Sequence, residues 1–367
     1  MSSSVLVSGA GIGGPVLAYW LARHGFDVTI VERAPAPRRG GQAVDLRGAA
    51  VTVAERMGIL EQVLAKRTQM LGMSMVDRDG NETMRTTERT VSAGRLDGDD
   101  VEIMREDLVA IVTAAAGDAE VIYGDSVAAL AQDADGVDVT FERGGRRRFD
   151  YVVGADGLHS NVRALAFGEE SRFVRHLGMY VSIYSAPNFL GLDRWQIWHR
   201  EGDAGYGIYS APGNASIRVN AGFGAEQPIA FDHRDIEAQK RMVEEHCSAL
   251  GWETPRLMKG MWEADDFYFD AAAQIHMDRW STGRVALLGD AGYCASLLSG
   301  QGSSLAVVGA YVLADELGAD RRGAFDRYEE RMRRFVRLNQ ELATENPGEG
   351  ASDESVRRAA TAISLDR

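Results

Sequence analysis

The amino-acid sequence predicts an α/β fold that combines a discontinuous parallel-sheet domain with an inserted antiparallel sheet and a long helix near the C-terminus. Short apolar runs typical of buried parallel strands, each followed by a glycine-containing turn, occur at residues 5–7, 151–153 and 284–288. Residues 173–221 alternate in polarity and are rich in aromatic side chains, which is typical of antiparallel strands. A long apolar stretch at 305–317 indicates a buried helix.

Residues 4–33 hold the strongest local pattern in the chain. The first apolar strand is followed by Gly9-Ala10-Gly11-Ile12-Gly13-Gly14, and then by residues 15–23, whose apolar side chains share one helical face. Gly25 can end this helix, and a second buried-type strand runs from 28 to 31. Strand, glycine-rich turn, helix and strand in this register predict a Rossmann-like unit.

Each part of this pattern meets a requirement for binding the pyrophosphate of a dinucleotide. Gly9 permits the tight turn, Gly11 lets the pyrophosphate approach the backbone, and Gly14 lets the helix lie close to the strand, while Gly13 belongs to the same turn. The helix N-terminus offers free N–H groups and partial positive charge. Glu32 follows the second strand, where a carboxylate accepts hydrogen bonds from an adenosine ribose and disfavours the 2′-phosphate of NADP. The alternative is a glycine-rich turn that binds no ligand.

Length and composition limit the classes of protein that the sequence can encode. The 367 residues are enough for two domains, and 45% hydrophobic with 26% charged residues is typical of a globular protein. A formal net charge of −14 disfavours nucleic acid or an anionic membrane surface as a partner. Two cysteines, no apolar run long enough to span a membrane, and an N-terminus that enters the first strand at once lead us to expect a cytoplasmic protein. The sequence indicates no oligomeric state.

The segments between these landmarks also have recognisable patterns. Helical patterns occur at 49–66, where we expect one helix, and at 104–116, 232–250, 253–263 and 325–342. Further strand patterns occur at 73–76, 82–84, 121–123, 137–141, 149–153 and 267–276. We expect an irregular polar segment at 86–100 and a mobile tail after residue 346, in which 354–362 can form a further helix.

The order of these elements predicts a dinucleotide-binding domain that is divided by an insertion. We assign residues 1–70, 101–175 and 279–345 to this domain and its long C-terminal helix. Residues 71–100 and 176–278 form the predicted substrate domain, and residues 346–367 form the tail.

Two further motifs narrow the choice of dinucleotide. Gly154-Ala155-Asp156-Gly157 follows the apolar run at 151–153, and Gly289-Asp290-Ala291 follows the apolar run at 284–288. Together with the first glycine-rich turn, these motifs resemble the FAD-dependent aromatic monooxygenases, the family of para-hydroxybenzoate hydroxylase and the tetracycline-inactivating monooxygenases. The resemblance covers about residues 1–345 and implies non-covalently bound FAD as the cofactor.

The resemblance implies roles for residues around the FAD. Asp290 would hold the ribityl chain, Asp156 would contact the nucleotide, and Arg105 would face the ribityl–phosphate region. Asp45 and Arg47 lie in the segment that passes the isoalloxazine ring in this family. The other predicted cofactor-binding residues are Arg33, Gly289, Gly300 and Gly302.

Local structural roles are the alternatives for these residues. Asp290 can act as the N-cap of the following segment, and Asp156 can belong to a simple strand-to-helix turn. Arg33 and Arg105 can be solvated surface charges. A cation is disfavoured in the first turn of a helix, so the position of Arg105 favours a bound phosphate.

The resemblance also implies a reaction. NADPH or NADH reduces FAD, the reduced flavin and O₂ form a C4a-hydroperoxide, and one oxygen atom passes to an aromatic or polyketide-type small molecule while the other leaves as water. The cofactor supplies the chemistry, so no catalytic side chain is predicted, and the histidines show no metal-ligand spacing. The alternatives are an FAD-dependent dehydrogenase, reductase or halogenase, or a non-catalytic protein that binds flavin or another ligand.

Aromatic residues of the middle block are the predicted lining of the substrate cavity: Trp195, Trp198, Tyr206 and Tyr209. Aromatic walls suit a planar aromatic or polyketide ligand. Packing within the core of the sheet is the alternative role for each residue.

One region departs from the family pattern. The family has a histidine and one or two prolines before the turn that leads into the last apolar helix, whereas this chain has Tyr293, Ser296 and Leu297. Proline stiffens a loop, so we expect the wall beside the flavin to be more mobile, or reshaped to suit a different substrate, and we expect some loss of reducing equivalents to H₂O₂.

Overall fold

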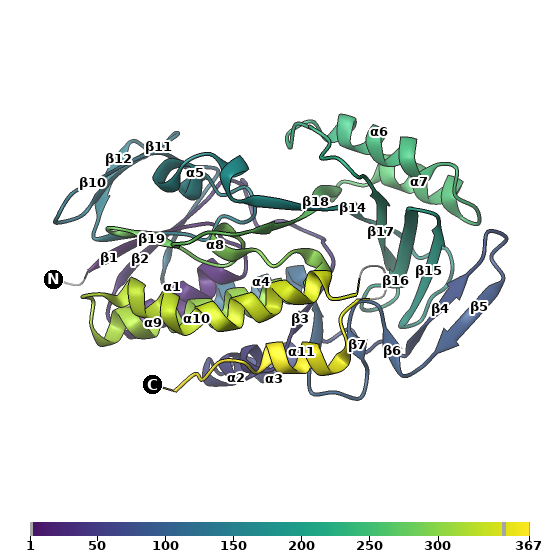
Figure 1. Cartoon of the computed structure of the whole chain (residues 1–367), viewed down its shortest axis with the longest axis horizontal. Helices are drawn as coiled ribbons and strands as arrows, with labels where there is room; N and C mark the ends of the chain where they lie inside the picture. Colours follow the sequence, from purple (N-terminus) through teal and green to yellow (C-terminus); the bar gives the residue numbers. More distant parts are fainter. Residues whose placement is uncertain (1–2, 347–349, 367) are drawn as a thin grey trace.

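The computed structural model describes residues 3–346 and 350–366, and Figure 1 shows two sheets joined by long strands. One sheet has six strands and is mainly parallel, and the other has seven strands and is mainly antiparallel. Long helices lie beside the first sheet, and a separate helix pair lies over the second (Figure 1). The predicted fold class, an α/β fold with an inserted antiparallel sheet, is therefore confirmed.

The parallel sheet has the strand order β19-β20-β13-β1-β2-β9. Its strands are β1 (Ser4–Ser8), β2 (Asp27–Glu32), β9 (Glu120–Tyr123), β13 (Tyr151–Gly154), β19 (Ser281–Thr282) and β20 (Val285–Leu287). β19 runs antiparallel to β20, and the other neighbouring pairs are parallel. Because β1 and β20 are buried along nearly their whole length, both appear in the sequence as continuous apolar runs.

The helices beside this sheet hold the glycine-rich turn in place. α1 (Gly13–Arg23) contacts α9 (Gly302–Ala319) and α4 (Arg105–Ala115), and α10 (Ala324–Glu341) runs alongside α9 (Figure 1). The shorter helices are α2 (Ala49–Arg56), α3 (Leu60–Ala65), α5 (Asn161–Phe167) and α8 (Asp290–Tyr293), with 3₁₀ turns η1 (Glu170–Arg172), η2 (Leu297–Ser299) and η3 (Leu342–Thr344). Within the described residues, no helix has the length and apolar character needed to cross a bilayer.

The second sheet has the strand order β18-β14-β17-β16-β15-β4-β5. Its strands are β4 (Gly72–Val76), β5 (Glu82–Thr86), β14 (Val174–Pro187), β15 (Trp195–Glu201), β16 (Ala204–Ser210), β17 (Ser216–Gly224) and β18 (Tyr268–Ile275). Helices α6 (Ile236–Cys247) and α7 (Thr254–Glu263) cover one face (Figure 1). The other face meets the parallel-sheet domain, where Arg218 donates to the carbonyl oxygen of Gly41 at 3.1 Å.

Three small sheets complete the fold. β3 (Ala43–Leu46) pairs with β8 (Val101–Met104), and β10 (Val127–Gln132), β11 (Val137–Phe141) and β12 (Arg146–Phe149) form a meander. β6 (Arg89–Thr90) pairs with β7 (Gly94–Arg95), so the segment at 86–100, which we expected to be irregular, contains a short hairpin.

One expectation about helices was wrong, and another is confirmed. Residues 49–66 form two helices because Gly58, between them, adopts a φ of 73°, which a continuing helix does not allow. In the tail, the helix expected at 354–362 is present as α11 (Asp353–Ala360), which buries Ala359, whose carbonyl oxygen accepts a hydrogen bond from Asn339 of α10. Residues 347–349 and 367 of the predicted tail lie outside the described residues.

Tyr293, one of the departures from the family pattern, points into the core. Its hydroxyl group pairs with that of Tyr328 at 2.7 Å, and the Tyr328 hydroxyl donates to the carbonyl oxygen of Leu287 at 3.1 Å. Gly309 on α9 leaves room for this pair, because a Cβ atom there would lie 2.1 Å from the Tyr293 hydroxyl oxygen. The large Tyr293 side chain on α8 therefore fits because α9 has a glycine, Gly309, at the facing position.

We predict that Gly309→Ala lowers the free energy of unfolding by about 1–3 kcal/mol, because the new methyl group overpacks the core. Tyr293→Phe in the same chain should recover part of this loss by removing the clashing oxygen. Gly260→Ala on α7 is the control, since its Cβ would meet Ala186 at an ordinary 3.5 Å. Chemical denaturation measures all three, and equal stability of the 309 and 260 variants would contradict the prediction.

Candidate functional site

The three glycine-containing motifs lie side by side because the strands that precede them are neighbours. Strands β20, β13 and β1 are consecutive in the parallel sheet, and Leu287, Gly154 and Ser8 stand at matched positions near their carboxyl ends. The turns that follow therefore start at the same edge of the sheet. In open α/β sheets, this edge is where ligands bind.

The first turn packs so closely that two of its positions exclude a side chain. Gly9 has a φ of 111°, and a Cβ atom there would lie 2.4 Å from the carbonyl oxygen of Ala155 in the second motif. A Cβ on Gly14 would lie 2.0 Å from the carbonyl oxygen of Gly9. At Gly11, by contrast, a Cβ would meet no described atom within 4 Å. Gly11 therefore borders open space beside α1, where an anionic group can approach the backbone.

Glu32 ends β2 beside this turn. Its carboxylate accepts hydrogen bonds from the backbone N–H groups of Ala10 at 2.9 Å and Ala34 at 2.8 Å. These bonds fix the carboxylate at the turn and leave acceptor capacity for ligand hydroxyl groups. Arg33, its neighbour in the chain, is exposed on the surface.

Arg105 is the first residue of α4 and carries an unsatisfied buried atom. Its backbone N–H donates to the carbonyl oxygen of Gln42 at 3.0 Å, but its Nη1 atom is buried without a hydrogen-bond partner in the described part of the chain. Desolvation and the nearby charge of Arg38 lower the pKa of Arg105, while Tyr268 and Glu32 act in the opposite direction. A guanidinium nitrogen in this state is suited to bind an anion.

The third motif meets the first through Ala306 of α9. Cβ atoms built on Gly13 and Gly289 would lie 3.5 Å and 3.4 Å from the Ala306 Cβ, so the first and third motifs both border α9 at this residue. Gly302 begins this helix, and a Cβ on it would lie 3.8 Å from Oδ1 of Asp290. The Gly289–Asp290 turn and the N-terminus of α9 are therefore adjacent.

The turn before α9 also contains an unpaired buried amide. Gln301, between Gly300 and Gly302, is 0% exposed, and neither atom of its side-chain amide has a partner among the described residues. Gly300 adopts a left-handed conformation with a φ of 64°, which shapes this turn. Desolvation raises the pKa of Asp290, while the Cys294 thiol that hydrogen-bonds with it acts in the opposite direction.

Asp45 and Arg47 lie against the same helix N-terminus. Ser304 of α9 donates to the carbonyl oxygen of Asp45 at 3.2 Å and accepts from the backbone N–H of Arg47 at 3.0 Å. The Arg47 guanidinium pairs with Oδ2 of Asp45 at 2.8 Å, and Oδ1 of Asp45 is buried without a partner in the described residues. Burial raises the pKa of Asp45, although Arg47 opposes this effect.

Asp156 in the second motif stabilises its own turn. Its carboxylate accepts hydrogen bonds from the Ser160 hydroxyl at 2.5 Å, from the Val162 N–H at 3.1 Å and from the Ser8 hydroxyl at 3.4 Å. The alternative of a strand-to-helix turn therefore accounts for the contacts of Asp156 within the protein.

The structure divides the four predicted aromatic residues between the two faces of the seven-stranded sheet. Trp198 and Tyr209 face the parallel-sheet domain, where the Tyr209 hydroxyl accepts from the backbone N–H of Ala43 at 2.9 Å. The Trp198 ring covers Gly207, at which a Cβ would lie 2.5 Å from the ring.

Trp195 and Tyr206 lie on the opposite face, beneath or beside α6 and α7. Tyr206 belongs to the core there and donates to the carbonyl oxygen of Gly251 at 3.0 Å. The prediction that all four residues line one cavity therefore needs correction. Residues three apart on one strand point to opposite faces, and both aromatic pairs have this spacing.

Two buried amides were missed by the sequence analysis. Gln196 is 0% exposed and lies on the same face as Trp198, whose indole N–H donates to its side-chain oxygen at 3.0 Å. The two-residue alternation along β15 was the available signal for Gln196. The sequence contains no comparable signal for Gln301, which sits in a turn.

The loop before α9 favours the second of the two expectations, a reshaped backbone. Ser296 has a φ of 74°, a value that proline cannot adopt, so this backbone could not hold a proline at position 296. The Ser296 hydroxyl accepts from the backbone N–H of Leu298 at 3.4 Å, and its carbonyl oxygen accepts from the Ser299 hydroxyl at 2.8 Å. Leu297 is 45% exposed at the surface of this loop.

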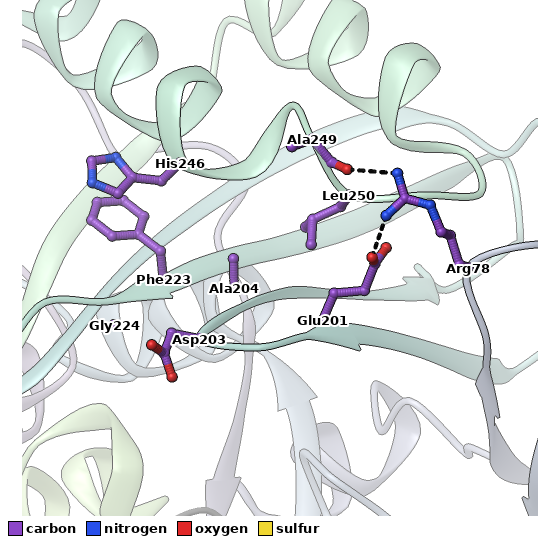
Figure 2. A pocket seen from close by; sticks show the side chains of 9 residues that line it. All are labelled: Arg78, Glu201, Asp203, Ala204, Phe223, Gly224, His246, Ala249 and Leu250. Atoms are coloured by element: carbon purple, nitrogen blue, oxygen red, sulfur yellow. Dashed lines mark hydrogen bonds and ion pairs between the residues drawn. The ribbon is translucent and has the colours of Figure 1, made fainter.

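A separate hollow of ≈ 340 Å³ lies on the outer side of the seven-stranded sheet (Figure 2). It is lined by Arg78, Glu201, Asp203, Ala204, Phe223, Gly224, His246, Ala249 and Leu250. The Arg78–Glu201 ion pair crosses one end of it (Figure 2). None of the predicted cofactor or substrate residues lines this hollow.

Comparison with known proteins agrees with the arrangement of the three motifs. Residues 2–341 match the family described as FAD binding domain. The chain is 48% identical over 352 residues to uncharacterized protein Rv1260 of Mycobacterium tuberculosis (strain ATCC 25618 / H37Rv), covering 95% of this chain and 94% of that protein. It is 39% identical over 343 residues to a flavin-dependent monooxygenase of Legionella longbeachae, covering 92% and 87% respectively.

Solved structures give the same result. The chain matches the crystal structure of tetracycline destructase Tet(51) with a TM-score of 0.90, 35% identity and 100% coverage of both chains. The crystal structure of CtdE in complex with FAD, at 14% identity and a TM-score of 0.76, shares the fold. The chain therefore belongs to the family of FAD-dependent monooxygenases of the aromatic hydroxylase type.

Proposed function

We propose that this monooxygenase oxygenates an aromatic, polyketide-type small molecule bound between the two sheets, with O₂ as oxygen source and NADPH or NADH as transient reductant. The observation that supports this most strongly is a set of buried polar atoms without protein partners at one edge of the parallel sheet: Nη1 of Arg105, both amide atoms of Gln301 and Oδ1 of Asp45. Buried polar atoms are normally hydrogen-bonded, so this set indicates a bound polar ligand. FAD offers matching phosphate, ribityl and ring groups.

The proposed contacts follow the order of the cofactor's parts. Glu32 accepts from the adenosine ribose, the backbone at Gly11 and the N-terminus of α1 face the pyrophosphate, and Arg105 binds its charge. Asp290 accepts from the ribityl hydroxyl groups. Gln301 and the N-terminus of α9 face the polar edge of the flavin ring, where negative charge accumulates on reduction. The bound flavin supplies the redox and oxygen-activating chemistry.

The substrate is proposed to lie on the inner face of the seven-stranded sheet. Trp198 offers an aromatic surface and Gln196 a buried amide, a combination that suits a planar ligand with ring oxygen atoms. The tetracycline destructases, which are similar to this chain at 35% and 37% identity, support a polycyclic substrate. Tetracycline is therefore the first probe ligand to test.

A hydrogen-bonded chain supports the position of Gln196. Its amide donates to the Ser92 hydroxyl, which in turn donates to Oε1 of Glu102, while the Thr68 hydroxyl donates to Oε2. Burial raises the pKa of Glu102 to about 7, and the neighbouring Asp45 adds to the effect. We propose that Glu102 positions Gln196 through Ser92.

Asp290→Ala should lower FAD affinity about 10–100-fold, because charge-assisted hydrogen bonds worth about 1.5–3 kcal/mol are lost. Asp156→Ala is the matched comparison, since its carboxylate is occupied within its own turn and its loss should mainly reduce stability. Flavin fluorescence titration of the cofactor-free protein and chemical denaturation separate the two effects. Equal FAD affinity in the Asp290 variant and the parent would contradict the proposed ribityl contact.

Trp198→Ala should weaken tetracycline binding at least about tenfold by removing a buried aromatic surface, while FAD content stays unchanged. Trp195→Ala is the control, because Trp195 lies on the same strand but on the opposite face. Calorimetric titration of the holoenzymes with tetracycline measures the difference. Equal tetracycline affinity of the two variants would refute the proposed position of the ligand. Absence of tetracycline binding to the parent would refute the proposed class of ligand.

Glu102 should make the free energy of unfolding depend on pH between the ordinary glutamate pKa of 4.5 and its raised pKa of about 7. The folded state holds the Glu102 proton more tightly than the unfolded state does. The stabilisation from this proton is therefore complete below pH 4.5 and is lost as the pH rises through 7. Glu102→Gln keeps the group neutral and should flatten this decline, which amounts to on the order of 3 kcal/mol. Denaturation at several pH values tests it, and an unchanged profile in the variant would contradict the assignment.

A further inference from the structure

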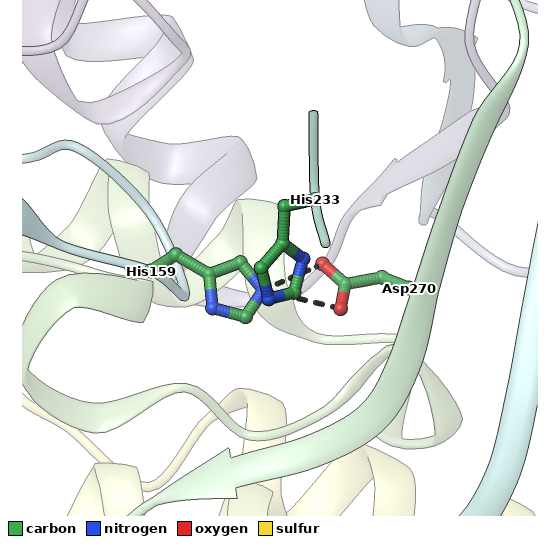
Figure 3. Close-up of side chains that lie close together, drawn as sticks. All are labelled: His159, His233 and Asp270. Carbon is green, nitrogen blue, oxygen red and sulfur yellow. Dashed lines mark hydrogen bonds and ion pairs between the residues drawn. The ribbon is translucent and has the colours of Figure 1, made fainter. Parts of the chain in front are cut away.

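Three side chains that are far apart in the sequence converge at the junction of the two sheets (Figure 3). His159 follows β13 of the parallel sheet, His233 precedes α6, and Asp270 lies on β18 of the seven-stranded sheet. Their potential ligand atoms all lie within 4.8 Å of one another, and Nε2 of His159 is 3.2 Å from both carboxylate oxygens of Asp270.

The second nitrogen of His159 has a carboxylate partner of its own. Nδ1 of His159 is 2.8 Å from Oε1 of Glu170, and the other oxygen of Glu170 accepts from the buried Arg163 at 2.5 Å. A histidine that binds a metal ion usually donates its other N–H group to a carboxylate, which fixes the tautomer and the ring orientation. Glu170 is placed to accept the Nδ1–H group of His159, and Arg163 holds Glu170 in position. This arrangement leaves Nε2 of His159 directed at Asp270.

His233 has unused ligand capacity. Among the described residues its ring lies against that of His159, with 3.7 Å between ring centroids and 43° between ring planes, and contacts Phe231, but it makes no hydrogen bond. A neutral imidazole ring offers one nitrogen lone pair to a metal ion, and no hydrogen bond among the described residues occupies that of His233. The ring is also exposed, which allows a metal ion to enter from solvent and the side chain to turn toward it.

We propose that His159, His233 and Asp270 form a binding site for a divalent cation of the zinc class, with water as the fourth ligand and Glu170 as the carboxylate that orients His159. Imidazole nitrogen with one carboxylate oxygen is a donor set that Zn²⁺ prefers, and bonds of about 2.0–2.1 Å place neighbouring ligand atoms about 3.3 Å apart. The 3.2 Å separation of His159 and Asp270 already matches this spacing. The proposal does not depend on the proposed substrate.

The bound ion would link the two sheets, because His159 lies in the turn that follows β13 of the parallel sheet and Asp270 lies on β18 of the other sheet. A metal ion binds the deprotonated imidazole nitrogen, so it would take the place of the hydrogen bond between Nε2 of His159 and the Asp270 carboxylate.

The test uses untagged holoenzyme that has been stripped with a chelator and titrated calorimetrically with Zn²⁺, followed by metal analysis after gel filtration. We expect one Zn²⁺ per chain in the parent. His233→Ala should lower the affinity at least about 100-fold, and Glu170→Gln about 10–100-fold with the stoichiometry retained. FAD content should stay at the parent level in both variants.

His233→Ala is informative because the ring makes no hydrogen bond in the described structure, so its loss does not threaten folding. His246→Ala is the control, since His246 stacks on Phe223 at 3.9 Å away from the cluster and should bind Zn²⁺ like the parent. Absence of Zn²⁺ binding in the parent would overturn the proposal, as would equal affinity in the parent and the His233 variant.

Discussion

A guanidinium group with one buried, unpaired nitrogen among the described residues is the constraint on which our proposal for the cofactor site depends. Arg105 begins α4, one of its terminal nitrogens is buried and unpaired within the described residues, and a neighbouring cation lies close by. Leaving a cation in this state costs free energy unless an opposite charge is supplied. The open backbone at Gly11 and the N-terminus of α1 also favour an anion. The phosphates of one dinucleotide would satisfy all three features.

Much of this side of the molecule was predictable from the sequence because its constraints are local. A buried parallel strand is apolar along its length, and a turn such as Gly9–Gly14 tolerates no side chain at 2.0 Å from a neighbouring carbonyl oxygen. These requirements leave a pattern within about 30 residues of sequence. The place of Asp290 after β20 follows from the same rule, because parallel strands end at a common edge.

The features that were not predicted arise between segments that are distant in the chain. From the sequence we expected Tyr293 to alter the flavin environment, but its hydroxyl group fills the space beside Gly309 on another helix. Trp195 and Trp198 have the same chemistry, and only the pleat of β15 separates their roles. The packing of α11 on α10 and the meeting of His159 with Asp270 likewise depend on tertiary structure. No local sequence pattern encodes such pairings.

The central claim is that Arg105 is held unpaired for the phosphates of FAD, and one binding comparison tests it directly. Cofactor-free parent and Arg105→Ala protein are titrated with FAD and with riboflavin, which has the same ring and ribityl chain but no phosphate. The account predicts that the variant loses at least about 100-fold in FAD affinity, as expected when a charge-assisted contact to phosphate is removed, while riboflavin affinity stays unchanged. Equal FAD affinity in the two proteins, or an equal loss for both ligands, would contradict it.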